Sequence, residues 1–337
     1  MKIPKTRWAK LYEMADEILE LAPWETYFEE DLFAIQPRAE GTVYFVSVMG
    51  SQGEHHALAF YPGIESLSRF RKSQRDDVPY RIGVETMLLN QHLQLAFEQK
   101  RYLVPPDLVV LKSLGKVYRG KWPAFRSNRA ARLPWSPDSS EVDDLEILLE
   151  QSIVVLKRLN AGEKLLRPYN DDEFFLRKAD DGQWEDSLCR LEELTVPRHI
   201  LQAYLPEGVL DGLRKTNERI EIDLVLTITP ITDVPRGEAP YLPMMLLMVN
   251  STAGLVVGVE TLSTKDGMDA AMARIPDAIT NLLKKAKFVP ATFAARNPIL
   301  LSALESYCDA YGMEYEFDAE LPMAETAIES LMSFLEQ

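Results

Sequence analysis

The chain has 337 residues, of which 46% are hydrophobic and 26% are charged, a length and composition typical of a globular protein with two domains. Its net charge of −15 disfavours binding to the phosphate backbone of nucleic acids, which needs a basic surface. Apolar runs such as MMLLMV at 244–249 are far shorter than the ~20 residues that span a bilayer, so we expect a cytoplasmic protein that does not enter a membrane.

The N-terminal part begins with a predicted helix and a predicted hairpin. Apolar side chains recur at helical spacing over residues 6–22, and Pro23 ends this amphipathic helix, which lacks the apolar core of a signal peptide. Residues 42–49 and 56–61 are rich in β-forming side chains and flank the short polar sequence GSQGEH, which contains two glycines. These two segments predict an antiparallel β-hairpin.

Two further helices and an irregular segment are predicted after the hairpin. Residues 63–73 and 83–100 carry apolar side chains at helical spacing. Residues 117–135 contain prolines that interrupt regular structure, so this segment is predicted to be irregular.

An acidic segment predicts a long helix over residues 136–162. Ser139 or Ser140 is placed to cap its N-terminus, and acidic side chains fill its first turn. Residues 173–178 and 184–191 flank the turn sequence ADDGQ, which predicts a second pair of strands.

After residue 206 the elements follow a regular order. The pattern predicts strands and helices at 219–229 (strand), 241–250 (strand), 255–262 (strand), 266–285 (helix), 288–295 (strand), 298–311 (helix), 313–318 (strand) and 322–336 (helix). This order, β-β-β-α-β-α-β-α, resembles that of the ribonuclease-H-like fold. We therefore expect an α+β domain with a β-hairpin at 1–200 and an α/β domain with a mixed sheet at 206–337.

Four stretches carry a resemblance to a known family. They are VMGSQGEHHALAFYPG at 48–63, AFRSNRAARLPW before the acidic helix, PMMLLMVNSTAGLVVGVE, and the C-terminal sequence that begins PATFAARNPILLSALESYCDAYG. In this order they resemble a group of uncharacterised bacterial proteins made of two domains of unknown function. The resemblance covers most of the chain and implies a bacterial cytoplasmic protein, but it supplies no activity and no catalytic residue.

The tip of the predicted hairpin carries Glu54, His55 and His56, which have the chemistry of a general base or of metal ligands. Alternation along a strand sends the two histidines to opposite faces, which argues against a shared metal ion. Glycines at 50 and 53 favour a tight turn. We therefore expect a structural hairpin on which Glu54 or His55 lines a ligand cleft.

The two cysteines and the absence of nucleotide-binding or hydrolase motifs limit the chemistry further. Cys189 and Cys308 form no CxxC pair, so we expect buried free thiols and no zinc site. The sequence contains no GxGxxG, GxxxxGK[ST] or GxSxG motif.

The predicted C-terminal domain carries carboxylates on its first strand, first helix and last helix. Ribonuclease-H-like nucleases hold two metal ions with acids at such positions, so the resemblance suggests Asp223, Asp269 and Glu325 as ligands of Mg²⁺ or Mn²⁺. Asp266 and Glu329 are alternative acids on the same two helices. In this interpretation the protein is a divergent metal-dependent nuclease or phosphohydrolase.

Two features argue instead for an inactive scaffold without a cofactor. Arg296 and Asn297 stand at the end of the fourth strand, where an acid is expected, and a cation there repels Mg²⁺. Glu221 and Asp223 alternate with apolar residues, which is typical of a strand with one solvated face.

A basic and aromatic segment at 118–135 is the best candidate for an anion contact. Its cations are Arg119, Lys121, Arg126, Arg129 and Arg132, and its aromatic residues include Trp122, Phe125 and Trp135. These side chains could stack on bases or grip phosphates, but we expect them to pair with acidic residues of the C-terminal domain or of the following helix.

Our leading hypothesis is a non-catalytic binding or adaptor protein that recognises a protein partner or a small basic ligand and does not bind nucleic acid. The metal-dependent nuclease is the alternative. A third hypothesis is a small-molecule site between the domains near Glu54, His55 and Arg126, since pockets favour domain interfaces.

Overall fold

The protein combines helices with mixed sheets, as the sequence predicts. The computed structural model describes residues 3–53, 55–167, 172–194, 200–201 and 203–335. The chain divides into two compact units, Met1–Pro197 with Pro235–Ala239 and Arg198–Val234 with Pro240–Gln337. Each unit is built around its own large sheet.

The N-terminal unit contains a seven-stranded sheet in the order β5-β4-β3-β2-β1-β6-β7. Its strands are β1 (Phe33–Gln36), β2 (Tyr44–Met49), β3 (Ala57–Pro62), β4 (His92–Gln99), β5 (Lys121–Asn128), β6 (Glu173–Asp180) and β7 (Gln183–Arg190). Only β1 and β6 are parallel, and all other neighbours are antiparallel. The predicted hairpin is confirmed as β2 and β3, and the second predicted strand pair as β6 and β7.

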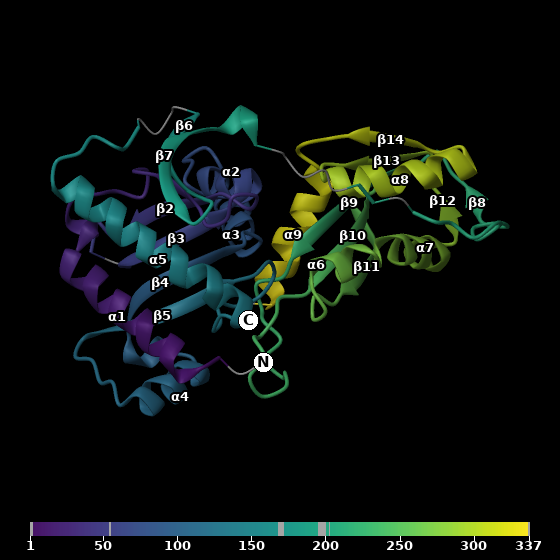
Figure 1. Ribbon diagram of the computed structural model, residues 1–337. Helices are drawn as coiled ribbons and strands as arrows, with labels where there is room; N and C mark the ends of the chain where they lie inside the picture. The colour runs from purple at the N-terminus through teal and green to yellow at the C-terminus, as the bar shows by residue number, and fades with distance from the viewer. Residues whose placement is uncertain (1–2, 54, 168–171, 195–199, 202, 336–337) are drawn as a thin grey trace. The chain divides into compact units, whose positions relative to one another are not determined.

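Helices cover both faces of this sheet (Figure 1). They are α1 (Lys5–Leu21), α2 (Gly63–Ser73), α3 (Tyr80–Leu88), α4 (Pro105–Leu114) and α5 (Ser139–Asn160), with short turns η1 (Pro23–Glu25), η2 (Lys100–Tyr102) and η3 (Leu191–Glu193). α1 and α5 lie side by side and bury their apolar stripes in the larger core cluster. α2 packs against the other face, where Leu67 and Phe70 join a second cluster.

The predicted helix over 83–100 is wrong in its second half. The helix ends at Leu88, and residues 92–99 form strand β4. Leu95 fits the helical spacing of this segment, but it alternates with Gln94 and Ala96 in a strand that pairs with both β3 and β5. The period of two in this segment prevails over the period of 3.6 that it also fits.

The prediction of an irregular segment over 117–135 is also wrong, because residues 121–128 form strand β5. Pro123 is tolerated since β5 is the edge strand of the sheet and pairs only with β4. On the outer side of β5, the backbone of Ser127 exchanges two hydrogen bonds with that of Trp135, at 2.8 and 3.1 Å.

Helix α5 confirms the predicted acidic helix but has a different cap. The carboxylate of Asp138 accepts hydrogen bonds from the backbone N–H groups of Ser140 and Glu141, at 2.9 and 3.0 Å. The Glu141 carboxylate in turn accepts from the backbone N–H of Asp138 at 2.8 Å, which completes a capping box. The cap is therefore the residue before the two serines.

The C-terminal unit contains a five-stranded sheet in the order β11-β10-β9-β13-β14. The strands of this unit are β8 (Arg214–Lys215), β9 (Arg219–Leu226), β10 (Met244–Asn250), β11 (Leu255–Leu262), β12 (Phe288–Val289), β13 (Thr292–Ala295) and β14 (Glu314–Phe317). β9, β10 and β11 are antiparallel neighbours, whereas β13 is parallel to both β9 and β14. β8 and β12 form a separate parallel pair.

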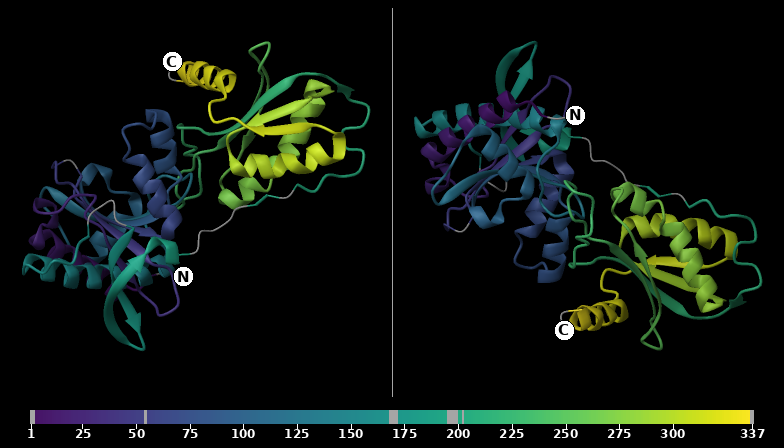
Figure 2. Two further views of the ribbon diagram at one scale, coloured as in Figure 1. Left: turned by 90° about the horizontal axis from the view of Figure 1, so that it is seen from above. Right: turned by 90° about the horizontal axis from the view of Figure 1, so that it is seen from below.

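The helices of this unit are α6 (Met268–Met272), α7 (Ile275–Ala286), α8 (Pro298–Tyr311) and α9 (Pro322–Leu335). α9 covers the face of the sheet opposite to α7 and α8 (Figure 2), and its Ala324 and Ile328 pack with Val225 and Leu247.

Two elements predicted for this unit are each divided in two in the structure. The helix predicted at 266–285 is interrupted between α6 and α7, and the strand predicted at 288–295 is interrupted at Pro290.

The structure also describes the two cysteines and the apolar character of the helices. Both cysteines are buried and free, and burial raises the pKa of each thiol to about 11. Among the described residues, no helix has both the length and the apolar character that crossing a bilayer requires.

Gly50, in the turn between β2 and β3, makes a testable contribution to stability. Its φ is +107°, and a Cβ atom there would lie 2.7 Å from the carbonyl oxygen of His55. We expect Gly50→Ala to lower the free energy of unfolding by roughly 2–4 kcal/mol, since both strain and a backbone clash oppose it. Gly53→Ala is the control, because Gly53 has a φ of +84° but no atom within 4 Å of the added Cβ. Urea unfolding measures both, and equal losses would contradict the role of the clash.

Candidate functional site

The hairpin places His55 next to the side chain of Gln94 from β4. The two Nε2 atoms are 3.1 Å apart, which is hydrogen-bond distance. His55 reaches solvent, but the surrounding protein removes enough water to lower the pKa of its imidazole. The lowered pKa favours the neutral imidazole at pH 7, which has one hydrogen-bond donor and one acceptor.

His56 has different partners. Its ring stacks on the indole of Trp24, with centroids 4.4 Å apart and planes 24° from parallel. Its Nδ1 contacts the Nζ atom of Lys121, and burial together with that cation lowers the pKa of His56. The two histidines thus belong to separate groups of side chains.

A pocket of about 300 Å³ opens beside the hairpin. Its lining consists of Phe28, Glu29, Glu30, Gly50, Ser51, Gln52, His55 and Gln74. Burial, and after it the neighbouring carboxylate of Glu30, raise the pKa of Glu29. We call this the His55 pocket. Glu54, which the sequence analysis grouped with His55, lies outside the described residues.

Arg126, the third predicted ligand-binding residue, does not line this pocket. Its side chain is only 2% exposed, and its guanidinium donates to Oδ2 of Asp107 at 2.8 Å and to Oε2 of Glu98 at 2.9 Å. It also donates to the carbonyl of Tyr102 at 3.4 Å. Arg126 therefore ties β5 to β4, α4 and η2. Asp107 and Glu98 were missed from sequence, and the one local signal was that Arg126 directly follows the apolar run 122–125.

Another arginine of the basic segment pairs with the helix that follows, as expected. Arg129 donates to Asp138 at 2.7 Å and to Glu141 at 2.9 Å, the two residues of the α5 capping box. The desolvation of Arg129 lowers its pKa, but these two carboxylates outweigh that effect, and the net shift is upward.

In the C-terminal unit, the prediction that Glu221 and Asp223 lie on a solvated face is wrong. Glu221 is 1% exposed and Asp223 is 2% exposed, because α9 covers this face of the sheet. Glu221 accepts a hydrogen bond of 2.7 Å from the backbone N–H of Ala324, in the first turn of α9, and one of 3.2 Å from Arg219. These carboxylates lie beneath a helix, which the alternation alone does not reveal.

Arg296 lies between two of the predicted metal ligands. Its Nη2 atom donates to Asp223, and its Nη1 atom donates to Glu325 on α9. Burial acts to lower the pKa of Arg296, but the hydrogen bonds and charges of these two carboxylates more than offset it and raise the pKa. A guanidinium therefore occupies the space between the two acids.

The third predicted ligand, Asp269, is an exposed residue of the short helix α6. The alternative acid Asp266 is likewise exposed. Throughout the described ranges, the structure gathers no three His, Cys, Asp or Glu side chains in a geometry that could hold a metal ion. The structure thus brings Asp223 and Glu325 together through Arg296 but does not add Asp269 to a metal cluster.

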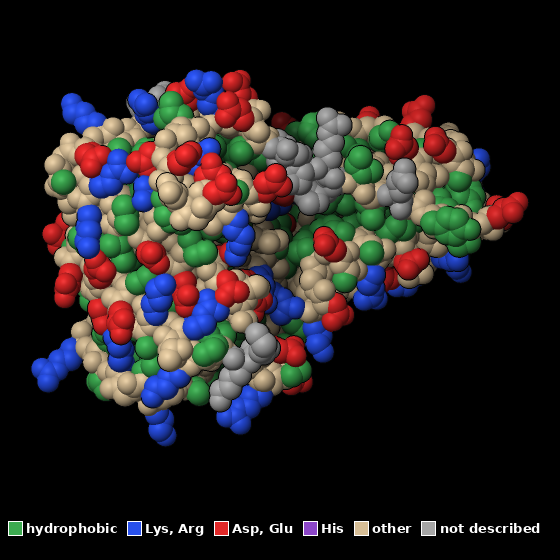
Figure 3. Space-filling view, in the orientation of Figure 1, with side chains coloured by type: hydrophobic (Ala, Val, Ile, Leu, Met, Phe, Trp, Pro, Cys, Tyr) green, Lys and Arg blue, Asp and Glu red, His purple; other side chains and the backbone are tan. Residues whose placement is uncertain are grey.

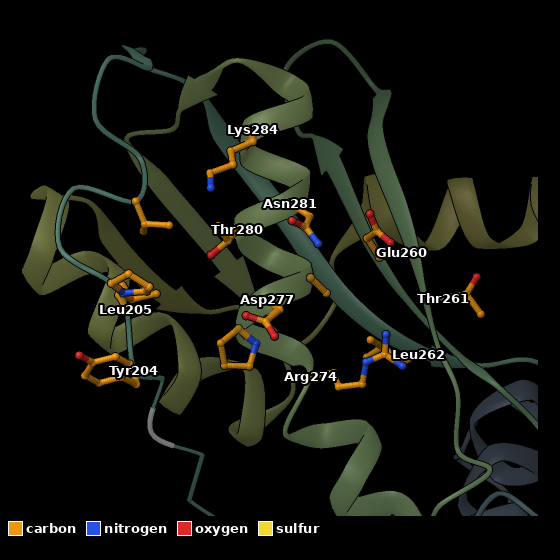
Figure 4. A pocket seen from close by; sticks show the side chains of 14 residues that line it. Tyr204, Leu205, Glu260, Thr261, Leu262, Arg274, Asp277, Thr280, Asn281 and Lys284 are labelled. Atoms are coloured by element: carbon orange, nitrogen blue, oxygen red, sulfur yellow. The ribbon is translucent and has the colours of Figure 1, made fainter.

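A second pocket, of about 370 Å³, lies on the exposed side of α7. Figure 4 shows Asp277, Asn281 and Lys284 projecting from α7, with Tyr204 on one side and Glu260 of β11 on the other. The charged side chains of the lining are Glu260, Asp277, Arg274 and Lys284. Two cations and two carboxylates give this pocket no preference for ligands of either sign.

The half-buried His92 on β4 makes the stability of the protein dependent on pH. Its ring packs against Tyr61 with centroids 5.0 Å apart, and burial lowers the pKa of His92 to about 4, against about 6.5 in an unfolded chain. The unfolded state therefore binds more protons between these values, so the stabilisation is complete above pH 6.5 and is lost as the pH falls toward 4.

We expect the free energy of unfolding to fall by about 2 kcal/mol more between pH 7 and pH 5 in the wild type than in His92→Gln. Urea unfolding at the two pH values measures this difference. Equal pH dependence of the two proteins would show that His92 does not titrate with a lowered pKa.

Comparison with known sequences places the chain in a family. The family described as "Domain of unknown function (DUF7309)" matches residues 8–177, half of the chain, and "Domain of unknown function (DUF6930)" matches residues 210–332. No curated protein sequence matches the chain. The two matched segments lie within the predicted domains 1–200 and 206–337. The chain belongs to the DUF7309 family, and its C-terminal part carries a DUF6930 domain.

Proposed function

We propose that the protein is a non-catalytic binding or adaptor protein whose C-terminal domain is a ribonuclease-H-like scaffold without nuclease chemistry. In this proposal the two domains of the protein span residues 1–200 and 206–337, and the protein acts in the cytoplasm. The observation that carries the proposal is the guanidinium of Arg296 between the carboxylates of Asp223 and Glu325.

The strand arrangement of the C-terminal unit supports the scaffold part of the proposal. Three antiparallel strands lie in the order β11-β10-β9, and β13 and β14 follow on the other side of β9, parallel to it. Such a mixed sheet with helices on both faces is what the ribonuclease-H-like resemblance implies. Fold alone does not imply activity, so the side chains must decide.

The side chains favour binding over hydrolysis. Two-metal catalysis needs carboxylates that bracket a pair of cations about 4 Å apart. In this protein the positive charge between Asp223 and Glu325 is supplied by Arg296, which is covalently part of the chain. A metal ion would have to displace the half-buried guanidinium of Arg296 and leave it without its partners, which is costly.

Calorimetric titration of Mn²⁺ tests this proposal. We expect no binding by the wild type at millimolar Mn²⁺, because Arg296 already neutralises the acids. In Arg296→Ala, two carboxylates lose their cation, so the variant should be destabilised by roughly 3–5 kcal/mol. Millimolar Mn²⁺ should restore part of that stability, measured by urea unfolding.

The control is Asp223→Asn. Mn²⁺ binding by the wild type that disappears in Asp223→Asn would overturn the proposal and favour a metal-dependent nuclease that uses Asp223, Asp269 and Glu325. Hydrolysis of a nucleic acid or phosphate ester by the purified protein, lost in the same variant, would have the same meaning.

The His55 pocket favours a second candidate function, the binding of a small organic cation. Glu29 and Glu30 supply two carboxylates, and in the described part of the chain neither forms an ion pair. Phe28 is 60% exposed at the rim, so its ring face is available to a cation. The neutral His55 supplies a hydrogen bond without repelling positive charge.

Titration with butylammonium, followed by the NMR signal of the His55 ring, tests this site. We expect a saturable shift that is absent with neutral butanol and is weakened by Glu29→Gln/Glu30→Gln. The matched control is Glu13→Gln/Glu20→Gln, which removes the same charge from exposed positions of α1. Equal weakening by both double variants would mean that the pocket does not select the cation.

A further inference from the structure

Residues 100–119 form a basic and apolar surface on an acidic protein. We call it the α4 surface, and it consists of the exposed apolar residues Tyr102, Leu108, Val109 and Val117 together with the exposed cations Lys100, Arg101, Lys112 and Arg119. Figure 3 shows the blue side chains gathered around the position that α4 occupies in Figure 1. The apolar residues are 43–82% exposed.

Helix α4 has apolar side chains on its outer side as well as its inner side. Asp107 and Leu111, one turn apart, are buried, while Leu108 and Val109 point outward and are 43% and 67% exposed. A helix on a protein surface normally presents polar residues to water. Exposed apolar residues that are grouped and bordered by charges are typical of an interaction site.

The cations of this surface are not neutralised by the protein itself. In the part of the chain that the structure describes, Lys100, Arg101, Lys112 and Arg119 form no ion pair with a carboxylate. The single acidic residue of the segment, Asp107, is buried against Arg126. The surface therefore carries positive charge on a chain whose net charge is −15.

The surface is also held in a fixed position. Arg126 binds the Asp107 carboxylate of α4 and the Tyr102 carbonyl of η2, so one buried guanidinium fastens both elements to the sheet. The ammonium of Lys100 lies 5.2 Å from the centre of the Trp122 ring, and the guanidinium of Arg101 lies 4.8 Å from that of Tyr102. A surface that is ordered before binding loses less entropy when a partner docks.

We propose that the α4 surface is the docking site for an acidic segment of a partner protein that covers Leu108, Val109 and Val117 with apolar side chains. Charge complementarity selects this occupant, since acidic residues of the partner pair with Lys112 and Arg119. An anionic lipid surface is disfavoured because it extends beyond the α4 surface and also faces the rest of a chain whose net charge is −15, whereas a short acidic segment meets mainly the cations within a Debye length of it. The proposal goes beyond the proposed function and does not depend on the Asp223 carboxylate.

Fluorescence anisotropy with a defined probe tests the proposal on the full chain. The probe is a fluorescein-labelled synthetic peptide in which pairs of Leu alternate with pairs of Glu. We expect binding that weakens with added salt, and a loss of affinity of at least about tenfold in Lys112→Glu/Arg119→Glu. Val109→Ser should weaken binding several-fold while preserving the charge.

The matched control is Lys72→Glu/Lys164→Glu, which changes the net charge by the same amount at exposed positions away from the α4 surface. Affinity unchanged in this control supports the proposal, whereas equal loss in both double variants would overturn it. Failure of the wild type to bind the peptide would also overturn it, as would binding to phosphatidylserine vesicles instead of the peptide. Circular dichroism melting of each variant verifies that the fold is intact.

Discussion

Arg126 shares its buried guanidinium between the carboxylates of Glu98 and Asp107, and three elements of the N-terminal unit meet at this cluster. The C-terminal unit repeats the arrangement with Arg296 between two acids that come from β9 and α9. The buried charges of the two clusters, those of Arg126, Asp107 and Asp223, are acceptable in the interior because each has a partner of opposite charge. The placement of α4 and that of α9 on their sheets both depend on an arginine.

This use of arginine also explains where charge remains available for recognition. The acids of β9 have partners within the protein: Glu221 accepts hydrogen bonds from Arg219 and from the α9 backbone, and Asp223 accepts one from Arg296. Two arginines of the basic segment, Arg126 and Arg129, are likewise bound to acids of the same unit, whereas Arg119 belongs to the α4 surface. The cations of the α4 surface and the carboxylates of the His55 pocket are charges that these internal ion pairs do not include.

Much of the secondary structure could be predicted from hydrophobic period, capping and turn residues. The β2–β3 hairpin, the β6–β7 pair and helix α8 have strong local patterns, and all three are confirmed. β4 was missed because a residue such as Leu95 satisfies both a helical and an alternating pattern. β5 was missed because Pro123 is a breaker in general but is acceptable in an edge strand.

The site was harder to predict than the fold, for a physical reason. Arg296 and Asp223 are 73 positions apart, and Arg126 and Asp107 are 19 apart, so neither pair has a local signature in one sequence. The sequence did indicate that Arg296 stands where an acid was expected. It did not indicate that the guanidinium reaches Asp223, because that depends on β13 lying next to β9.

The proline of β5 has a consequence for self-association. The backbone N–H of Phe97 donates to His56 on the far side of β4, so Pro123, which lies opposite Phe97, has its nitrogen on the open side of β5. An added strand would find no donor at Pro123, and four residues further along it would find the Ser127 backbone already bonded to Trp135. Edge-to-edge pairing of sheets into aggregates is therefore opposed along β5 by the N–H group that Pro123 lacks and by the Ser127–Trp135 backbone hydrogen bonds.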